Sequence, residues 1–455
     1  MPDTIAAIAT IQAPSAIGIV RLTGPDTRRI LDGVFAPANG RPMSAQTPRK
    51  LVFGRALDRS GGVIDEALAV LFPGPNSYTG EDCAEIHCHG SPVVLDEVLA
   101  AAFARGARQA RGGEFTQRAF LSGRMDLIQA ESVADLIDAE SAGAARNAVG
   151  QLQGRMSRSV GGIYDALMDV VSRFYAIVDY PDEEIEPLQQ AQIEQTLAES
   201  AERLDALLAT FSRGRLLKSG VPAVILGKPN AGKSSLLNAL LGYDRAIVTD
   251  IAGTTRDTVE EKVLVGSVLL RLCDTAGIRD AADTVERLGV ERAQQAAQRA
   301  ELALLVLDGS APLTREDEEA IAAARRARRM LVLVNKADLP QVLDTAALRV
   351  RFGEVISLSA RSGAGVDALC RAVEELFAGG ETPRGELLTN ARQAESAQRA
   401  LDAVRRAEQA LRSGLSPDAV LTDAEEALEA LAEFSGKRVR DDLVATIFSR
   451  FCVGK

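Results

Sequence analysis

The sequence has no tryptophan, and its 455 residues include five cysteines and two histidines. The lack of tryptophan removes the largest stacking surface for single-stranded bases. Five cysteines are too few for the disulfide scaffold of a small secreted protein. No basic stretch of a secretory signal follows Met1-Pro2-Asp3. We therefore expect a cytoplasmic protein with reduced thiols.

Long apolar runs and an excess of positive charge are also missing. No run reaches the roughly 18 residues that a membrane-spanning helix needs, so we expect no membrane partner. The net charge is −11, from 52 basic and 63 acidic residues, which excludes a protein that coats nucleic acid with a large basic surface. The remaining composition is that of a globular protein. Its length predicts about three domains.

The hydrophobic pattern divides the chain into four stretches. Residues 1–118 mix short apolar runs with a helical pattern over 93–104, which predicts an α+β domain. Residues 119–217 and 381–455 carry helical periodicity. Residues 218–380 alternate short apolar runs with helical patterns, as in a parallel sheet covered on both faces. Because the C-terminal helices cannot bury their apolar stripes alone, we predict one split α-helical domain with a Ras-like α/β domain inserted in it.

The α/β stretch begins with a phosphate-binding pattern. Residues 227–234 read GKPNAGKS, after an apolar run at 223–226 and before an apolar helix at 236–241. The glycines allow backbone N–H groups to cradle phosphate, the Lys233 ammonium can reach the β- and γ-phosphates, and the Ser234 hydroxyl can ligate Mg²⁺. This pattern alone does not separate ATP from GTP.

Three further segments, each at the end of an apolar run, decide the base. The carboxylate of Asp274 in DTAG (274–277) can hold the metal through water. The carboxylate of Asp338 in NKAD (335–338) can accept two guanine N–H groups that adenine lacks, and SAR (359–361) can offer N–H groups to guanine O6. All lie at the carboxyl edge of the predicted sheet, which predicts a GTPase. The predicted GTP-binding residues are Asn230, Ala231, Gly232, Lys233, Ser234, Ser235, Thr249, Asp250, Ile251, Ala252, Gly253, Thr254, Thr255, Asp274, Thr275, Ala276, Gly277, Asn335, Lys336, Ala337, Asp338, Ser359, Ala360 and Arg361.

The loop between the first two motifs has the position of a γ-phosphate sensor. It reads TDIAGTTRD over 249–257, and we expect Thr255 to complete the Mg²⁺ shell with Ser234. Small signalling GTPases place a water-orienting glutamine directly after the second motif. Here that position is Ile278, which cannot form a side-chain hydrogen bond, so another group must orient the attacking water.

Five long motifs narrow the class further. They are PGPNSYTGED (73–82), GEFTQRAFL (113–121), DLIQAESVADLI (126–137), the 249–257 loop and the terminal FCVGK (451–455). With the GTPase motifs, they resemble the family of tRNA modification GTPases called MnmE or TrmE, in order and over essentially the whole chain.

The resemblance implies a fold and a function. The N-terminal domain would bind folate and form a homodimer, followed by a split helical domain and an inserted GTPase domain. The protein would be a potassium-stimulated GTPase that works with the FAD-dependent partner MnmG, in a heterotetramer. Together they would install an aminomethyl-type group at C5 of the wobble uridine of certain tRNAs. A tetrahydrofolate, in its 5-formyl or 5,10-methylene form, would supply the one-carbon unit.

The resemblance also implies roles for individual residues. K⁺ would take the place of an arginine finger, and Glu286 would orient the attacking water through a second water. In the N-terminal domain, basic groups suit the glutamyl tail of folate and a carboxylate suits the donor edge of the pterin. The implied K⁺ ligands are Asn230, Thr249, Ile251 and Thr254, and the implied folate ligands are Arg21, Glu81, Arg124 and Lys455. The role of Cys452 stays open.

The sequence departs from the family pattern around the folate pocket. Where the family usually has a glycine-rich turn, this sequence reads APSAIG at 13–18. Where the family usually has His-Gly-Gly, it reads HGS at 89–91, and Arg124 replaces the more usual lysine. These departures leave the GTP chemistry untouched. They bear on the detail of folate binding.

The sequence contains two other patterns that suggest a binding site, and it leaves two alternative functions open. The Cys and His residues within 81–89 could suggest a metal site, although a loop–strand edge near the folate pocket explains them better. The arginines of 325–329 could contact RNA phosphate, although the solvated last turn of a helix explains them better. The alternative functions are a GTP-switched ribosome-assembly factor and a nucleotide-regulated scaffold, both without folate chemistry.

Overall fold

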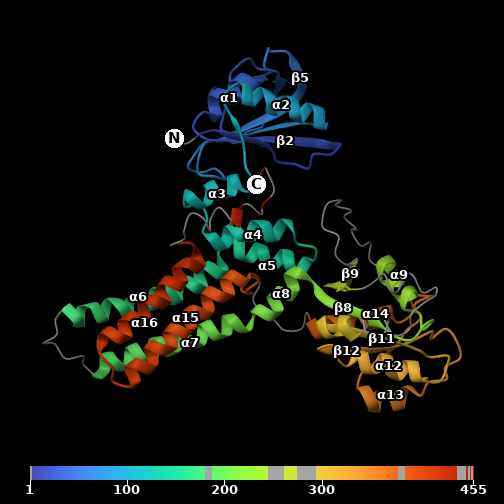
Figure 1. Ribbon diagram of the computed structural model, residues 1–455. Helices are drawn as coiled ribbons and strands as arrows, with labels where there is room; N and C mark the ends of the chain where they lie inside the picture. Colours follow the sequence, from blue (N-terminus) through green and yellow to red (C-terminus); the bar gives the residue numbers. More distant parts are fainter. Residues whose placement is uncertain are drawn as a thin grey trace. The chain divides into compact units, whose positions relative to one another are not determined.

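The computed structural model describes residues 3–179, 187–243, 261–273, 294–377, 385–437, 447–448, 451 and 454. The chain forms two compact units, each drawn from separate stretches of the sequence (Figure 1). The first unit comprises Met1–Ala134, Gln151–Leu204 and Glu395–Lys455, and the second comprises Asp135–Gly150 and Asp205–Ala394.

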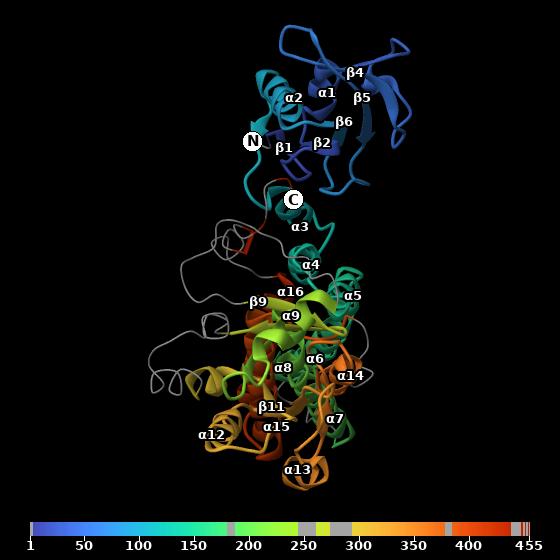
Figure 2. The same ribbon diagram turned by 90° about the vertical axis from the view of Figure 1, so that its right-hand side faces the viewer.

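A seven-stranded sheet lies in the N-terminal part of the first unit. The strand order is β3-β4-β5-β6-β2-β1-β7, antiparallel except for the β1–β7 pair. Helices α1 and α2 cover one face of this sheet (Figure 2). The elements are β1 (Ile5–Ile8), β2 (Ser15–Thr23), α1 (Thr27–Val34), β3 (Phe35–Pro37), the 3-10 turn η1 (Met43–Ala45), β4 (Val52–Leu57), β5 (Val63–Phe72), β6 (Cys83–Gly90), α2 (Pro92–Ala104) and β7 (Arg108–Gln109).

The segment 81–89 runs from a loop into strand β6, as the sequence predicts. The strand pairs with both β5 and β2 in the interior of the sheet. Its side chains alternate, so Ile86 and Cys88 enter the core under α1 and α2 whereas Glu85 and His87 lie on the opposite face. Burial raises the pKa of Cys88 to about 12, with a further contribution from Asp65. No group of three or more metal-ligand side chains occurs within the described ranges.

Four long helices of the first unit lie side by side in a bundle (Figure 1). Ion pairs connect α15 to α7, through Arg412 and Glu194, and α15 to α16, while Tyr175 of α6 donates to Glu425 of α16. The bundle thus joins helices from both sides of the inserted α/β domain, which confirms the predicted split helical domain. The four bundle helices are α6 (Arg155–Asp179), α7 (Pro187–Ala209), α15 (Ala391–Arg412) and α16 (Pro417–Ser435). Shorter helices in the same stretch of sequence are α3 (Glu114–Leu121), α4 (Leu127–Ile137), α5 (Ala142–Leu152) and α8 (Phe211–Ser219), of which α8 and most of α5 belong to the second unit. None of the helices described is long and apolar enough to cross a membrane.

The second unit contains the predicted α/β domain. Its six-stranded sheet has the order β13-β12-β11-β8-β10-β9, parallel except for the β9 edge strand. Every residue of β11 is buried. Leu304 and Val306 face the cluster of α9 and α14, while Leu305 and Leu307 face that of α12 and α13. The elements are β8 (Val221–Leu226), α9 (Lys233–Tyr243), β9 (Glu261–Val265), β10 (Val268–Leu272), β11 (Leu302–Asp308), α12 (Arg315–Ala324), β12 (Arg329–Asn335), α13 (Thr345–Phe352), β13 (Val355–Ser357) and α14 (Val366–Phe377).

The sequence predicted that the arginine run at 325–329 forms the last turn of a helix, and this prediction is wrong. Helix α12 ends at Ala324, and the run forms the following turn and the first residue of β12. Arg328 pairs with Glu301, and the Arg329 guanidinium lies 4.8 Å from the centre of the Phe377 ring. Local contacts therefore engage part of this run.

The chain returns from the α/β domain through a fixed junction. The buried Asn147 of α5 accepts hydrogen bonds from the amides of Gly385 and Leu387, at 3.2 and 3.4 Å, and donates to the Leu387 carbonyl at 3.3 Å. A Cβ on Gly214 of α8 would stand 2.0 Å from the Leu388 carbonyl oxygen, so only glycine permits this approach. The returning segment is thus held against α5 and α8.

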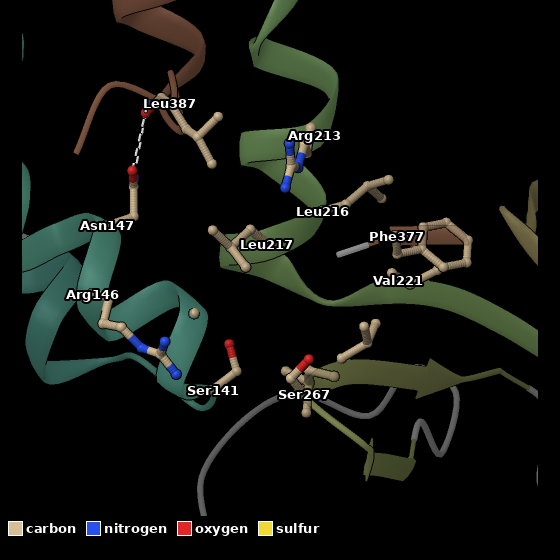
Figure 3. A pocket seen from close by; sticks show the side chains of 13 residues that line it. Ser141, Arg146, Asn147, Arg213, Leu216, Leu217, Val221, Ser267, Phe377 and Leu387 are labelled. Carbon is tan, nitrogen blue, oxygen red and sulfur yellow. Dashed lines mark hydrogen bonds between the residues drawn. The ribbon is translucent and has the colours of Figure 1, made fainter. Parts of the chain in front are cut away.

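A cavity of about 230 Å³ borders this junction (Figure 3). Aliphatic side chains of α8, β8 and β10 line it, together with Phe377 and the side chains of Arg146 and Arg213. Val221 in its wall begins β8, whereas the phosphate-binding sequence follows the other end of that strand. The cavity is therefore separate from the predicted nucleotide site.

We predict that Asn147→Ala loosens the junction, because it leaves three backbone groups without their buried side-chain partner, each costing about 1–3 kcal/mol. Hydrogen–deuterium exchange should become faster at the amides of Gly385 and Leu387. Arg146→Ala, at the neighbouring exposed position of α5, is the control and should leave this exchange unchanged. Equal protection in the Asn147→Ala variant would contradict the role of the amide.

Candidate functional sites

The phosphate-binding sequence forms a tight loop between β8 and α9. Gly227, Asn230 and Gly232 have φ angles of 155°, 61° and 101°, in the region that disfavours most side chains. A Cβ on Gly227 would stand 2.4 Å from the Val306 carbonyl oxygen, and one on Gly232 would stand 2.0 Å from Nδ2 of Asn335. The glycines therefore allow the loop to pack directly against β11 and the end of β12.

Lys233, the first residue of α9, turns its ammonium back onto this loop. Its Nζ donates to the carbonyl oxygens of Gly227, at 2.8 Å, and Lys228, at 2.9 Å. Burial lowers the pKa of Lys233. The positive charge of the motif is thus held within the loop by two carbonyl groups.

Asn335 connects three of the predicted motifs. Its side chain is buried, donates to the Ala231 carbonyl and accepts from the Ala360 amide, both at 2.9 Å. The Ala337 amide donates to the Leu358 carbonyl at 3.1 Å. The phosphate loop and the two predicted guanine segments therefore meet at the carboxyl ends of β8, β12 and β13.

The exposed Asp338 and the half-buried Lys336 lie at the guanine end of this edge. A hydrogen bond from Ser359 lowers the pKa of Asp338, so its carboxylate stays an acceptor. Lys336 donates to Oδ2 of Asp308 at 2.6 Å. Although burial opposes the charge of Asp308, hydrogen bonds from Lys336 and Ser310 lower its pKa. Sequence reasoning missed Asp308, although its place at the end of β11 could have indicated it.

The structure brings together the predicted residues of the phosphate loop, of NKAD and of SAR. The other predicted residues of the GTP site lie outside the described residues. These are Thr249, Asp250, Ile251, Ala252, Gly253, Thr254, Thr255, Asp274, Thr275, Ala276, Gly277 and Glu286.

The predicted folate ligand Arg21 lies on the face of β2 away from α1 and α2. Its Nε and Nη2 donate to Oε1 of Glu85 at 3.0 and 2.8 Å, and its guanidinium lies 5.8 Å from the ring centres of Tyr78 and Phe115. Nη1 donates to the carbonyl of Gly454 at 3.3 Å. The chain terminus thus reaches Arg21, although Lys455 itself is outside the described residues.

Glu81 belongs to the turn before β6, and Arg124 contacts the same turn. Arg124 Nε donates to the Ser77 carbonyl at 3.1 Å, and the Thr23 hydroxyl donates to Oε2 of Glu81 at 3.2 Å. Because Tyr78 of the same turn lies beside Arg21, the three described folate candidates all contact residues 77–81 or belong to them. The structure therefore groups them around one turn.

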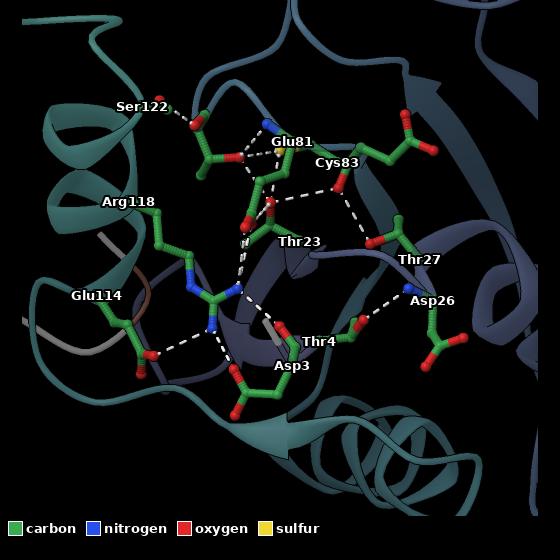
Figure 4. A network of polar contacts seen from close by, with 12 residues as sticks. Asp3, Thr4, Thr23, Asp26, Thr27, Glu81, Cys83, Glu114, Arg118 and Ser122 are labelled. Carbon is green, nitrogen blue, oxygen red and sulfur yellow. Dashed lines mark hydrogen bonds and ion pairs between the residues drawn. The ribbon is translucent and has the colours of Figure 1, made fainter. Parts of the chain in front are cut away.

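An ion network that the sequence did not reveal holds Glu81 (Figure 4). Arg118 of α3 contacts Oε2 of Glu81 at 3.1 Å, Oδ1 of Asp3 at 2.7 Å and Oε1 of Glu114 at 3.2 Å. Glu114 is buried, which opposes its charge. Hydrogen bonds from Arg108, the Arg111 amide and Arg118 nevertheless lower its pKa to about 2. Glu81 is thus held as part of a network of alternating charges.

A glycine loop at the start of a parallel sheet, closed at the same edge by NKAD and SAR, defines a P-loop GTPase. Family models described as "GTP-binding protein TrmE N-terminus" and "MnmE helical domain" match residues 4–124 and 127–452. Similar proteins with the name "tRNA modification GTPase MnmE" come from Roseiflexus sp. (strain RS-1), Symbiobacterium thermophilum and Chloroflexus aurantiacus, at 45%, 42% and 43% identity. Each alignment covers 100% of this chain and 99–100% of the relative. The chain belongs to the MnmE (TrmE) family of GTPases, as its sequence motifs predict.

We predict that Gly232→Ala weakens GTP binding by at least about tenfold. The left-handed φ costs about 1–2 kcal/mol for a residue with a Cβ, and the Cβ must also displace Asn335. Titration with a fluorescent GTP analogue measures this change. Gly242→Ala, at the other end of α9 with open space at its Cβ, is the matched control. Wild-type affinity in the Gly232→Ala variant would show that the close approach is dispensable.

Proposed function

We propose that the chain is a potassium-stimulated GTPase that modifies tRNA together with an FAD-dependent partner, MnmG. The pair installs an aminomethyl-type group at C5 of the wobble uridine of certain tRNAs, with a one-carbon unit from a tetrahydrofolate. Membership of the MnmE family carries this proposal, because its relatives are named for tRNA modification. The grouping of Arg21, Glu81 and Arg124 around one turn supports the folate part.

In the GTP site, the loop amides and Lys233 bind the phosphates, and Asp338 selects guanine. Ser234 and Thr255 would hold Mg²⁺, with Asp274 bound through water. The exposed Asn230, at the outer part of the phosphate loop, offers an amide oxygen of the kind that alkali cations bind. With oxygens of Thr249, Ile251 and Thr254, it would hold a K⁺ ion that stabilises charge on the phosphates. Glu286 orients the attacking water in place of the missing glutamine.

The steady-state rate of GTP hydrolysis in KCl and in NaCl tests the potassium requirement. We expect kcat to be at least about tenfold higher in KCl, because the ion replaces the charge of an arginine finger. Asn230→Ala should remove most of this difference. Asn238→Ala, an exposed position on α9, should retain it. Equal slow rates of the wild-type protein in both salts would refute the potassium mechanism.

In the folate site, two features suit the ends of the ligand. The side chain of Glu81 is 28% exposed, and its carboxylate can accept hydrogen bonds from the paired N–H donors of a pterin. An ion pair with Arg118 and a hydrogen bond from Thr23 fix its position. Arg21 and Arg124 place positive charge nearby for a glutamyl tail, with Lys455 from the chain terminus.

Calorimetric titration with 5-formyltetrahydrofolate tests this site. Glu81→Gln replaces a charged acceptor by an amide, and loss of a charged hydrogen bond costs about 1.5–3 kcal/mol, so affinity should fall at least about tenfold. Arg21→Ala should weaken binding as well. Glu66→Gln, an exposed carboxylate on β5, is the matched control. If the wild-type protein does not bind this folate, the one-carbon reaction loses its donor.

The proposed homodimer uses the N-terminal domain. Its sheet leaves one row uncovered by α1 and α2, where the apolar Phe53, Leu68 and Ile19 and the histidine His87 are register neighbours across β4, β5, β2 and β6. Phe53 is 54% exposed and Leu68 is 37% exposed. Burial of such a row against a second copy of the chain would stabilise a dimer. A heterotetramer with two copies of MnmG and a cytoplasmic location complete the proposal.

A further inference from the structure

The phosphate loop makes a contact that its known chemistry does not use. Nζ of Lys228 lies 2.8 Å from Oδ2 of Asp317, in the first turn of α12. The side chains are 11% and 1% exposed, so this is a buried ion pair. Burial of two charges is costly unless their geometry and hydrogen bonds are good. Attraction between surface charges therefore does not explain why this pair is buried.

Asp317 already has a structural role at the start of α12. It forms a capping box with Thr314, in which Oδ2 accepts from the Thr314 amide and hydroxyl at 2.8 and 2.9 Å. The same oxygen also accepts a hydrogen bond from the Lys228 ammonium. The other oxygen, Oδ1, is buried and has no hydrogen-bond partner among the residues that the structure describes. A capping box needs no lysine, so the contact with Lys228 is an addition to the cap.

At its other end, Lys228 supports the phosphate-binding lysine. The Lys228 carbonyl accepts from Nζ of Lys233 at 2.9 Å, beside the Gly227 carbonyl at 2.8 Å. The side chain of Lys228 is fixed on α12 while its backbone holds Lys233. A continuous chain of contacts therefore runs from Asp317 through Lys228 to Lys233.

We propose that Asp317 is a positioning residue for GTP binding and hydrolysis. Through Lys228 it anchors the first turn of the phosphate loop to α12, and so fixes the two carbonyl groups that orient Lys233. Loss of the anchor lets the loop sample conformations that do not bind phosphate, and the apparent dissociation constant rises as the inverse of the fraction that still binds. The inference rests on the GTPase site alone and is independent of folate, potassium and partner.

The test is Asp317→Asn in the full-length chain, since asparagine keeps the size and the capping acceptor but loses the charge. We expect the dissociation constant of a fluorescent GDP analogue to rise about tenfold, or about 1.4 kcal/mol. The KM for GTP should rise similarly, and kcat should fall less than about threefold because Lys233 and Ser234 remain.

Two controls on α12 separate positioning from stability. Glu318→Gln removes the neighbouring charge, which pairs with Arg351 and not with the loop. Thr314→Ala removes the hydroxyl of the cap but leaves Lys228 and Asp317 intact. Both can lower the melting temperature, and both should keep wild-type GDP affinity. Equal losses of affinity in Thr314→Ala and Asp317→Asn would assign the effect to the cap and overturn the proposal.

A double variant covers the case in which Asp317→Asn does not fold. Lys228→Met with Asp317→Asn removes both charges, so no unpaired charge stays buried. We expect this protein to fold and to bind GDP about tenfold more weakly, because the anchor is absent. Wild-type affinity and an unchanged KM in either folded variant would show that the pair only stabilises the fold.

Discussion

The contact between Asn335 and the phosphate loop is the constraint on which the GTP site depends. One buried amide group donates to Ala231 and accepts from Ala360, and so holds loops from β8, β12 and β13 in one arrangement. The bond is possible because Gly232 has no Cβ and adopts a left-handed φ. Specificity for the base and binding of phosphate are therefore not independent, since one side chain sets the separation of both subsites.

A second constraint follows from the insertion of one domain within another. The chain must leave the helices after α8 and return before α15, and both crossings lie close together. Asn147 fixes the return through three backbone hydrogen bonds, and Gly214 permits Leu388 to approach α8. Because the polar groups of the returning segment are paired, this junction can be buried without the penalty of unpaired amides. The returning segment is therefore joined to α5 and α8 by specific contacts as well as by the continuity of the chain.

The sequence predicted those features whose signal is local. Apolar runs such as 302–307 became buried parallel strands, because both faces of the sheet are covered. The phosphate loop was predictable because its chemistry requires fixed spacing. The strand at 83–90 was expected from the sequence, but its place between β5 and β2 was not, because strand order depends on pairings between distant segments. The residue roles implied for 249–255, 274–277 and Glu286 remain predictions.

The ion pairs were not predictable for a different reason. Lys228 and Asp317 are 89 positions apart, and Glu81 and Arg118 are 37 apart, so no periodicity connects them. Which carboxylate meets which cation depends on how strands and helices pack. From the sequence alone, Asp317 and Arg118 cannot be distinguished from charged residues on the solvated surface. Only burial separates a charge that holds a loop in place from one that keeps the protein soluble.

This distinction changes the meaning of the net charge of −11. Several cations near the two sites are already paired: Lys228, Arg118 and Arg21 contact Asp317, Glu81 and Glu85. Paired cations contribute little to long-range attraction of phosphate, which requires clustered and uncompensated positive charge. Under the proposed function, recognition of tRNA would then depend on short-range contacts, or on a surface shared with the proposed partner MnmG, and the acidic balance is compatible with both.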